Sequence, residues 1–264
     1  MKKFCYSLLV VAIAAASCKK NATPADASFT NNRSGSVNAN ARAATTVQFS
    51  GYTWNIRSTG SSTEGPGPNI FNGSNAWVDS NGWLHLKISK NTTTNKWNCA
   101  EVYTTQNFGY GTYQWQVEGA IGSLDKNIVL GLFNYSGNDG FDEMDIEFAR
   151  WGNNSWPNLN YTVFPATSSN KSDWNYTKDF TLTGGTYTTH RFKRSSNSVV
   201  FKSLNGFYND DTNLFASATC SAPAWSISTL SMPVHMNLWL FDGLAPSDSK
   251  EVEIIIHSFK FTAG

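Results

Sequence analysis

Residues 113–118, Tyr-Gln-Trp-Gln-Val-Glu, alternate strictly between apolar and polar side chains. Because successive side chains of a β-strand point to opposite faces of a sheet, this alternation predicts a strand with one buried face and one wet face. The stretch follows the turn residues Gly109-Tyr110-Gly111, where a strand can begin. It therefore indicates a sheet that packs against a core on one side.

Strand-like segments recur in both directions from this stretch. Residues 127–135 form a continuous apolar run, which is typical of a central buried strand. Turn pairs of the hairpin type occur at Gly184-Gly185 and Asn205-Gly206, and no window of useful length has helical periodicity. Further strands are expected at residues 83–88, 187–193, 198–204, 234–241 and 252–261. The sequence thus predicts an all-β fold of two packed antiparallel sheets.

The composition favours an uncharged partner. The 264 residues include 20 Lys and Arg against 19 Asp and Glu, and only 15% of the chain is charged. This balance disfavours nucleic acid, because binding to phosphates needs an excess of basic residues. Aromatic residues make up 14% of the chain, which argues against disorder. Neutral sugars suit such a polar and aromatic surface.

The first 46 residues are expected to lie outside the fold. Residues 1–17 resemble a secretory signal peptide, whose apolar run at residues 4–16 is shorter than the ~20 residues of a membrane span. Residues 15–18, Ala-Ala-Ser-Cys, resemble a bacterial lipobox and predict lipidation of Cys18; an ordinary signal peptide is the alternative. Residues 18–46 are predicted to be a flexible tether, and residues 47–264 the folded domain.

The cysteines and histidines give no sign of a metal site. Cys99 and Cys220 could pair in an oxidising envelope, but a single distant pair is weak evidence for a disulfide. No Cys-x-x-Cys or Cys/His ligand spacing occurs. The four histidines lie in strand-like segments, where a structural or surface role is the usual one.

An acidic cluster carries the candidate chemistry. Residues 141–148 read Phe-Asp-Glu-Met-Asp-Ile-Glu-Phe, and as a strand they place Glu143, Asp145 and Glu147 on one face together with Phe141. Like charges at neighbouring positions repel, and burial raises their pKa values, so a fold keeps such a row where the charges have a use. Metal binding, acid/base chemistry and the polar face of an edge strand are the alternatives.

The spacing of the acids favours acid/base chemistry. On a flat strand the Cα atoms of Glu143 and Glu147 would lie about 13 Å apart, but on a concave, twisted sheet their side chains can lean together. A retaining glycosidase needs two carboxyl groups about 5–5.5 Å apart, one as nucleophile and one as acid/base. Asp145 between them can hydrogen-bond to the nucleophile and modulate both pKa values.

The Glu-x-Asp-x-Glu motif at residues 143–147 resembles the signature of glycoside hydrolase family 16, the lichenase and laminarinase family. The resemblance covers roughly residues 50–262. It includes Cys-Ala-Glu-Val at residues 99–102 with the Gly-Tyr-Gly run that follows, Leu-Phe-Asn-Tyr at 132–135 and Met-Asn-Leu-Trp at 236–239. It implies a concanavalin-like jelly-roll sandwich of two antiparallel sheets with a concave substrate cleft.

The resemblance also implies a role for each acid. Glu143 would be the nucleophile and ionised, Asp145 its helper, and Glu147 the general acid/base, with a raised pKa so that it starts protonated. A motif without an extra residue before the last Glu is typical of lichenases and xyloglucan-active members, which favours a glucan containing β-1,4 linkages. No cofactor is required, although a structural calcium ion is compatible with the fold.

Four positions depart from the lichenase pattern. Tyr103 stands where lichenases often have Arg, Thr162 where they have Tyr, and Phe141 and Arg194 where they have Trp. These changes leave the catalytic triple intact and alter the contacts to substrate.

A set of candidate sugar-binding residues surrounds the triple. His235, Asn237 and Trp239 share a strand face that suits a wet groove, where an indole ring can stack on a sugar and an amide can bond to hydroxyl groups. A place in the core is the alternative for each aromatic residue. The full set is Asn69, Glu101, Tyr103, Phe133, Tyr135, Phe141, Asn160, Asn237 and Trp239.

The sequence therefore predicts a retaining endo-glycosidase that hydrolyses internal β-linkages of a polysaccharide, with a β-glucan as the favoured substrate. We expect an exported monomer, lipid-anchored in the bacterial cell envelope or else secreted, that meets the membrane only through its anchor. Transglycosylation would use the same residues, with a sugar hydroxyl in place of water. A non-catalytic glycan-binding protein on the same fold and a structural envelope protein are the alternatives.

Overall fold

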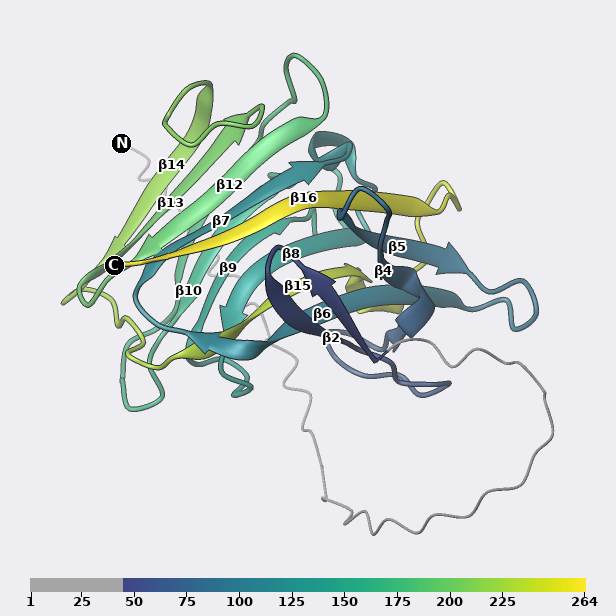
Figure 1. Ribbon diagram of the computed structural model, residues 1–264, viewed down its shortest axis with the longest axis horizontal. Helices are drawn as coiled ribbons and strands as arrows, with labels where there is room; N and C mark the ends of the chain where they lie inside the picture. Colours follow the sequence, from purple (N-terminus) through teal and green to yellow (C-terminus); the bar gives the residue numbers. More distant parts are fainter. Residues whose placement is uncertain (1–44) are drawn as a thin grey trace, which may run out of the picture. The chain divides into compact units, whose positions relative to one another are not determined.

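Sixteen β-strands follow one another along residues 45–264, the part of the chain that the computed structural model describes (Figure 1). Sheet I has the order β11 (Trp174–Lys178), β10 (Leu159–Phe164), β9 (Glu143–Phe148), β8 (Ile128–Tyr135), β15 (Met232–Leu240) and β6 (Trp97–Phe108). Sheet II has the order β5 (Leu84–Lys90), β16 (Val252–Ala263), β7 (Gly111–Glu118), β12 (Tyr187–Arg194), β13 (Ser198–Asn205) and β14 (Leu214–Ser221).

Short elements complete the two sheets. The strands β1 (Thr46–Phe49), β2 (Tyr52–Ile56), β3 (Ile70–Phe71) and β4 (Ala76–Val78) pair beside β6 and β5. Three 3-10 helices lie in the connections: η1 (Gly73–Asn75), η2 (Ile121–Ser123) and η3 (Phe241–Gly243). The first strand begins at Thr46, one residue before the predicted domain start.

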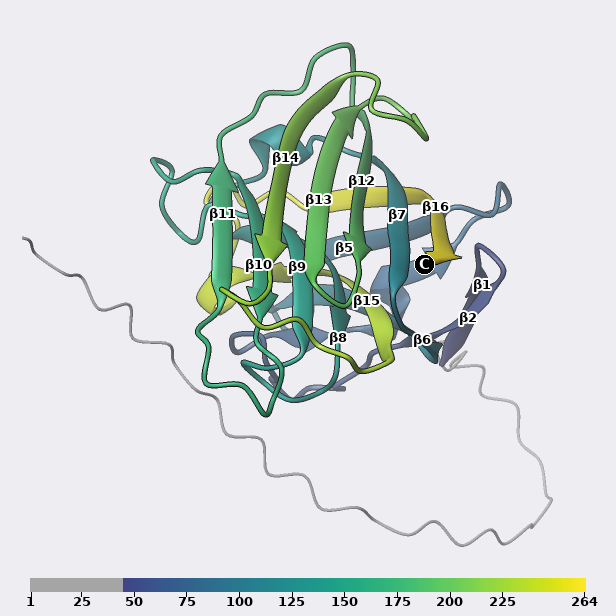
Figure 2. The same ribbon diagram turned by 90° about the vertical axis from the view of Figure 1, so that its left-hand side faces the viewer.

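The two sheets meet along one edge and otherwise lie face to face. β5 and β6 pair only through Ser89 with Asn98 and Lys90 with Trp97, so the sheet folds over at this point. Figure 2 shows β12, β13 and β14 of sheet II in front of β8, β9 and β10 of sheet I. The result is the predicted sandwich of antiparallel sheets, apart from the short parallel pair of β3 with β6.

The core lies between the sheets and follows the alternation of the sequence. Tyr113, Trp115 and Val117 of β7 are fully buried, whereas the residues between them are partly exposed. The Phe192 ring of β12 packs 4.6 Å from the ring of Tyr113 and 5.6 Å from that of Trp115, centroid to centroid. Burying each such side chain stabilises the fold by about 1.5–3 kcal/mol.

The predicted strands are confirmed, and of the two predicted hairpin turns one is confirmed as part of a hairpin, that of β13 and β14, while the other is wrong. The Gly184-Gly185 pair lies between β11 of sheet I and β12 of sheet II, so it joins the two sheets. The Asn205-Gly206 pair opens a longer connection, residues 206–213, between β13 and β14. Both Gly184 and Gly206 have positive φ, so the turn chemistry was recognised at both sites. At Gly184-Gly185 the chain passes to the other sheet instead of forming a hairpin, and at Asn205-Gly206 the hairpin of β13 and β14 has a loop longer than two residues.

Cys99 and Cys220 are buried and free, so the disulfide that the sequence left open is absent. Cys99 lies in β6 of sheet I, and Cys220 lies in β14 at the far edge of sheet II. Within residues 45–264 no helix is long and apolar enough to cross a membrane, and no cluster of three or more His, Cys, Asp or Glu suits a metal ion. The predicted signal, the lipidated Cys18 and most of the tether lie outside the described residues.

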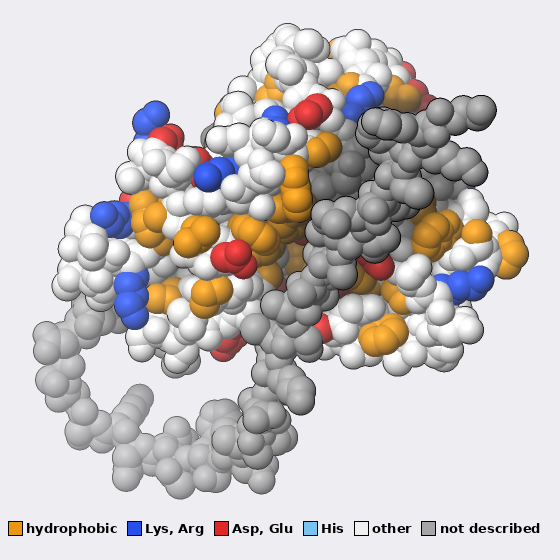
Figure 3. Space-filling view, turned by 180° about the vertical axis from the view of Figure 1, so that it is seen from behind, with side chains coloured by type: hydrophobic (Ala, Val, Ile, Leu, Met, Phe, Trp, Pro, Cys, Tyr) orange, Lys and Arg blue, Asp and Glu red, His pale blue; other side chains and the backbone are white. Residues whose placement is uncertain are grey.

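The surface reflects the low charge of the chain. Seen from behind, apolar side chains are spread over the visible face with few charged ones between them (Figure 3). The charged fraction of 15% leaves much of the surface to neutral polar and apolar groups.

Candidate active site

The acidic strand β9 is a central strand of sheet I. It pairs with β10 on one side and β8 on the other, so the edge-strand alternative is wrong. Met144 and Ile146 are fully buried in the core. Because side chains alternate along a strand, Glu143, Asp145 and Glu147 point to the opposite face of sheet I, which we call the acid face.

β9 begins at Glu143, two residues later than predicted. Asp142 has a φ of 51°, in the left-handed region, which breaks the alternation before the strand. Its carboxylate accepts hydrogen bonds from the backbone N–H and the hydroxyl of Thr167. Phe141 therefore precedes the strand, and the prediction that alternation places it beside the acids is wrong.

A polar row crosses the acid face at Glu147. Its register partners are Asn160 on β10 and Gly131 on β8; Gly131 faces Asn237 of β15, which faces Glu101 of β6. A Cβ atom at Gly131 would lie 2.4 Å from Oδ1 of Asn237, so glycine here leaves room for the Asn237 side chain. Asn237 Oδ1 is buried without a hydrogen-bond partner.

A stack of rings crosses the acid face at Asp145. Phe133, His235 and Tyr103 are successive register partners on β8, β15 and β6. The His235 ring stacks between the other two, with ring centroids 5.0 Å from Phe133 and 5.2 Å from Tyr103. Rings stacked in this way cover one another's faces, and Phe133 is only 8% exposed. The placement of Phe133 therefore leaves little of its ring for the predicted contact with a sugar.

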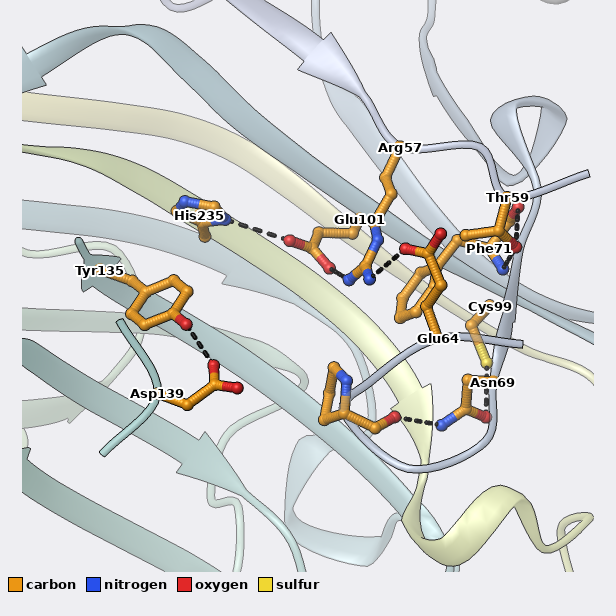
Figure 4. A network of polar contacts seen from close by, with 11 residues as sticks. Arg57, Thr59, Glu64, Asn69, Phe71, Cys99, Glu101, Tyr135, Asp139 and His235 are labelled. Carbon is orange, nitrogen blue, oxygen red and sulfur yellow. Dashed lines mark hydrogen bonds and ion pairs between the residues drawn. The ribbon is translucent and has the colours of Figure 1, made fainter. Parts of the chain in front are cut away.

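A line of ion pairs extends from His235 across the acid face (Figure 4). His235 Nδ1 lies 3.1 Å from Glu101 Oε1. Arg57 donates to Glu101 Oε2 at 2.6 Å and to Glu64 at 2.9 Å. Burial would raise the pKa of Glu101, but the hydrogen bonds and charges of His235 and Arg57 together lower it.

Arg57 is a site residue that the sequence analysis missed. It follows β2 and lies 44 residues before Glu101 in the chain, and no motif surrounds it. The guanidinium that lichenases often carry two residues after the Glu is replaced here by Tyr103. In this structure Arg57 supplies a guanidinium to Glu101 from another strand.

Tyr135 is tied to the loop between β8 and β9. Its hydroxyl donates to the carboxylate of Asp139 (Figure 4). Asp139 was not predicted from the sequence, because the conformation of its loop depends on turn geometry and the alternation of a strand does not extend into it. Its charge adds to the burial that raises the pKa of Glu143, which places Asp139 in the electrostatic environment of the triple.

An aromatic cluster lies beyond the Glu147 row. Trp239 is two residues after Asn237 on β15 and thus on the same face, but it is only 7% exposed. Its ring lies 6.2 Å from that of Trp151, which in turn lies 5.7 Å from that of Phe241. Trp151 lies three residues after the end of β9 and has a φ of 50°, which bulky side chains rarely adopt. Trp239 was predicted from the sequence, whereas Trp151 was not.

Two predicted sugar-binding amides make internal hydrogen bonds. Asn69 is 2% exposed, donates to the carbonyl of Leu240 at 2.8 Å and accepts from the Cys99 thiol at 3.4 Å. It holds its loop in place, and its placement gives no support to a contact with sugar. Asn160 donates to the carbonyl of Ala149 at 3.1 Å and keeps its place in the row beside Glu147.

The three acids share a strongly desolvated environment. Burial raises the pKa of Glu143 to about 8, with the charge of Glu147 adding to the effect, and raises the pKa of Glu147 to about 7. Burial and the two glutamates raise the pKa of Asp145 well above its ordinary value. The raised pKa of Glu147 agrees with the prediction, whereas that of Glu143 was not foreseen. With a pKa of about 8, Glu143 cannot be fully ionised at neutral pH.

Asp145 and Glu143 influence each other's protonation. The charge of Glu143 helps to raise the pKa of Asp145, and Asp145 Oδ2 is buried without a hydrogen-bond partner. Two carboxylates can share a hydrogen bond only if one carries a proton. A protonated Asp145 would donate to Glu143 and lower its pKa.

The fold is similar to that of known β-glucanases. The β-glucanase of Bacillus licheniformis aligns with a TM-score of 0.59 and 21% identity, over 80% of this chain and 92% of that chain. A β-1,3-1,4-glucanase (lichenase) from a mouse hindgut metagenome aligns with a TM-score of 0.57 and 19% identity, over 80% and 93% of the two chains.

A third structure is described as an immunostimulatory antigen and pseudo β-1,3-glucanase of Mycobacterium tuberculosis. It aligns with a TM-score of 0.57 and 16% identity, over 80% of this chain and 91% of that chain. No family model and no curated protein matches the sequence. The structural likeness confirms the fold that the acidic motif implied, the concanavalin-like sandwich of glycoside hydrolase family 16.

Proposed function

We propose that this protein is a retaining endo-glycosidase that hydrolyses internal β-linkages of a polysaccharide, with a β-glucan as its substrate. One observation carries the proposal. Glu143, Asp145 and Glu147 form a row on the acid face of a central strand, where burial raises the pKa of all three carboxyl groups. The similarity of the fold to β-glucanases supports it.

The proposed reaction has two steps. Ionised Glu143 attacks the anomeric carbon while protonated Glu147 gives its proton to the leaving oxygen, and a covalent glycosyl-enzyme forms. Glu147 then removes a proton from water, which attacks the same carbon and releases Glu143. Protonated Asp145, two residues from Glu143 on the same face of β9, stabilises the Glu143 carboxylate in the first step. The product keeps the β configuration.

The charges of the acid face favour an uncharged substrate. Glu64, Glu101 and Asp139 add carboxyl groups to the three of the triple. Arg57 is paired with Glu64 and Glu101. An anionic chain such as a sulfated glycan would meet repulsion at each of these positions. A neutral glucan would meet acceptors for its hydroxyl groups.

A non-catalytic glycan-binding protein is the second candidate function. It is favoured by one comparison, the pseudo β-1,3-glucanase that shares this fold. In that case the acid face would bind sugar without turnover, since fold alone does not fix activity. A transglycosylase would turn over by the same first step, with a sugar hydroxyl as the acceptor.

Glu143→Gln tests the proposal. We expect turnover of the best substrate among lichenan, laminarin and xyloglucan to fall by about 10⁴-fold or more, because the nucleophile is lost while the shape is kept. Binding of the glycan should be retained, and the melting temperature at neutral pH should not fall below that of wild type. Glu253→Gln, which changes a carboxyl group on sheet II, is the matched control. Wild-type protein with no reducing-end release on any of these glycans would favour the binding function instead.

A further inference from the structure

The outward face of sheet II carries a second array of polar and aromatic side chains. Because Tyr113, Trp115 and Val117 of β7 face the core, the alternate residues face away from it. These outward residues are Thr112, Gln114, Gln116 and Glu118. The acid face lies on the far side of the other sheet, so the core separates the two arrays.

Neighbouring strands extend this array into a polar floor. β12, β7 and β16 lie side by side in Figure 1. Ser258 and Lys260 of β16 are register partners of Gln116 and Gln114. The Ser258 hydroxyl donates to the side-chain amide oxygen of Gln116 at 2.8 Å. Amide and hydroxyl groups that both donate and accept thus follow one another along the strand.

The connection after β13 forms a wall beside this floor. Gln114 donates to Asn209 at 2.9 Å, and Arg191 donates to the carbonyl of Asp210 at 2.7 Å. Between floor and wall lies an open hollow of about 670 Å³, lined among others by Thr112, Gln114, Arg191, Asn209 and Lys260. We call the floor, the wall and this hollow the outer groove.

One end of the outer groove is aromatic. β16 shifts its register against β7 between Ile256 and Ser258, and a bulge of this kind re-aims a side chain. The bulged residue is His257, whose ring lies 4.0 Å from that of Trp83 and 4.9 Å from that of Phe207. Tyr187 packs beside Phe207 at 4.9 Å and is 46% exposed.

The charges along the outer groove are largely compensated. Arg191 and Lys202 both pair with Asp211, and His257 Nε2 lies 2.7 Å from Glu118. The groove therefore attracts neither a strongly anionic nor a strongly cationic polymer. Aromatic rings at one end and uncharged donors and acceptors along the floor match a neutral sugar chain, which has apolar ring faces and a rim of hydroxyl groups.

We propose that the outer groove is a second carbohydrate-binding site that holds a neutral β-glucan chain away from the acid face. The identity of the glycan rests on the proposed function. Tyr187 and Phe207 supply the apolar contact, and Gln114, Gln116 and the His257–Glu118 pair bond to hydroxyl groups. A polymer held there keeps the acid face close to further chain segments, whereas a short oligosaccharide gains nothing from it.

Counting bound oligosaccharides tests the second site. Isothermal titration of the Glu143→Gln protein with a lichenan hexasaccharide should give two molecules per chain, because the two sites lie on opposite faces. Adding Trp83→Ala and Tyr187→Ala should reduce the count to one. Tyr187→Ala alone, at a largely exposed position, should weaken the second site by about tenfold. Leu230→Ala, which removes a similarly exposed side chain elsewhere (47% exposed), should leave the count at two.

Each outcome separates this inference from the proposed function. One bound molecule that disappears in the Trp83→Ala/Tyr187→Ala protein would support the outer groove and count against binding at the acid face. One molecule in both proteins, two in both, or none in either would overturn the proposal. In an otherwise wild-type background, the same double substitution should lower kcat/KM on polymeric lichenan and leave kcat/KM on the hexasaccharide unchanged. A change on both substrates would also contradict it.

Discussion

At the scale of single residues, the geometry of the acid face depends on groups that no motif marks. Glu101 is 6% exposed, and its two oxygens contact Arg57 and His235. A buried carboxylate without such partners is strongly destabilising. We therefore expect Arg57 to stabilise the fold and, under the proposed function, to hold Glu101 in a fixed orientation toward the substrate.

Arg57→Met tests this double role. We expect the free energy of unfolding to fall by about 3 kcal/mol, because Glu101 loses its main cation while it stays buried. KM should rise roughly tenfold, since Glu101 is no longer held in place, while kcat changes little. Urea unfolding and steady-state kinetics measure the two effects.

Lys87→Met is the matched control for Arg57→Met. Lys87 pairs with Glu251 at 2.8 Å, and both side chains are about a third or more exposed, so its loss should change stability by about 0–1 kcal/mol. Equal effects of the two substitutions, or an unchanged KM in Arg57→Met, would contradict the role given to Arg57.

At the scale of the element, one face of β9 stabilises the fold, whereas the other lowers its stability when its carboxyl groups ionise. Its core face buries Met144, Ile146 and Phe148, whereas its acid face holds three carboxyl groups whose pKa values burial raises. A raised pKa means that the folded protein binds the proton more tightly than the unfolded chain. The resulting stabilisation is present below about pH 4.5, the ordinary pKa of glutamate, and is lost as the pH rises toward 8.

Melting temperatures measured over a series of pH values test this loss of stability at higher pH. Glu143→Gln cannot ionise, so it should exceed wild type in melting temperature by a margin that widens from pH 5 to pH 8. Each unit of pKa shift corresponds to about 1.4 kcal/mol, and each kcal/mol to about 2–4 °C for a domain of this size. Glu253→Gln, at a side chain that is 39% exposed, should show no widening. A constant margin in Glu143→Gln would count against a buried, desolvated triple.

At the scale of the whole molecule, local patterns predicted most of the sandwich but not the way its parts meet. Alternation in residues 113–118 and 143–148 identified β7 and β9 and the direction of their side chains. Arg57 and Asp139 reach the site from a strand end and a loop. The alternation of side chains along a strand does not predict which residues of such segments come close to the site. The stack of Phe133, His235 and Tyr103 likewise depends on register across three strands.

Our proposal for the cellular location of the protein rests on residues 1–18. We propose that Cys18 is lipidated and anchors the domain to the cell envelope. Cys18→Ser removes the thiol that lipidation requires, so the protein should move from the membrane fraction to the soluble fraction of the envelope. A mutant that stays with membranes after a high-salt wash would contradict the anchor, while wild type released by salt alone would favour simple secretion.

The stereochemistry of the product tests the central claim most directly. If Glu143 is the nucleophile and Glu147 the acid/base, the reaction passes through a covalent glycosyl-enzyme, and two inversions return the β configuration. Proton NMR of a fresh digest of the best β-glucan should show the β-anomer of the new reducing end first, with the α-anomer appearing later by mutarotation. The α-anomer appearing first would mean a single displacement by water, which would contradict the roles given to Glu143 and Glu147.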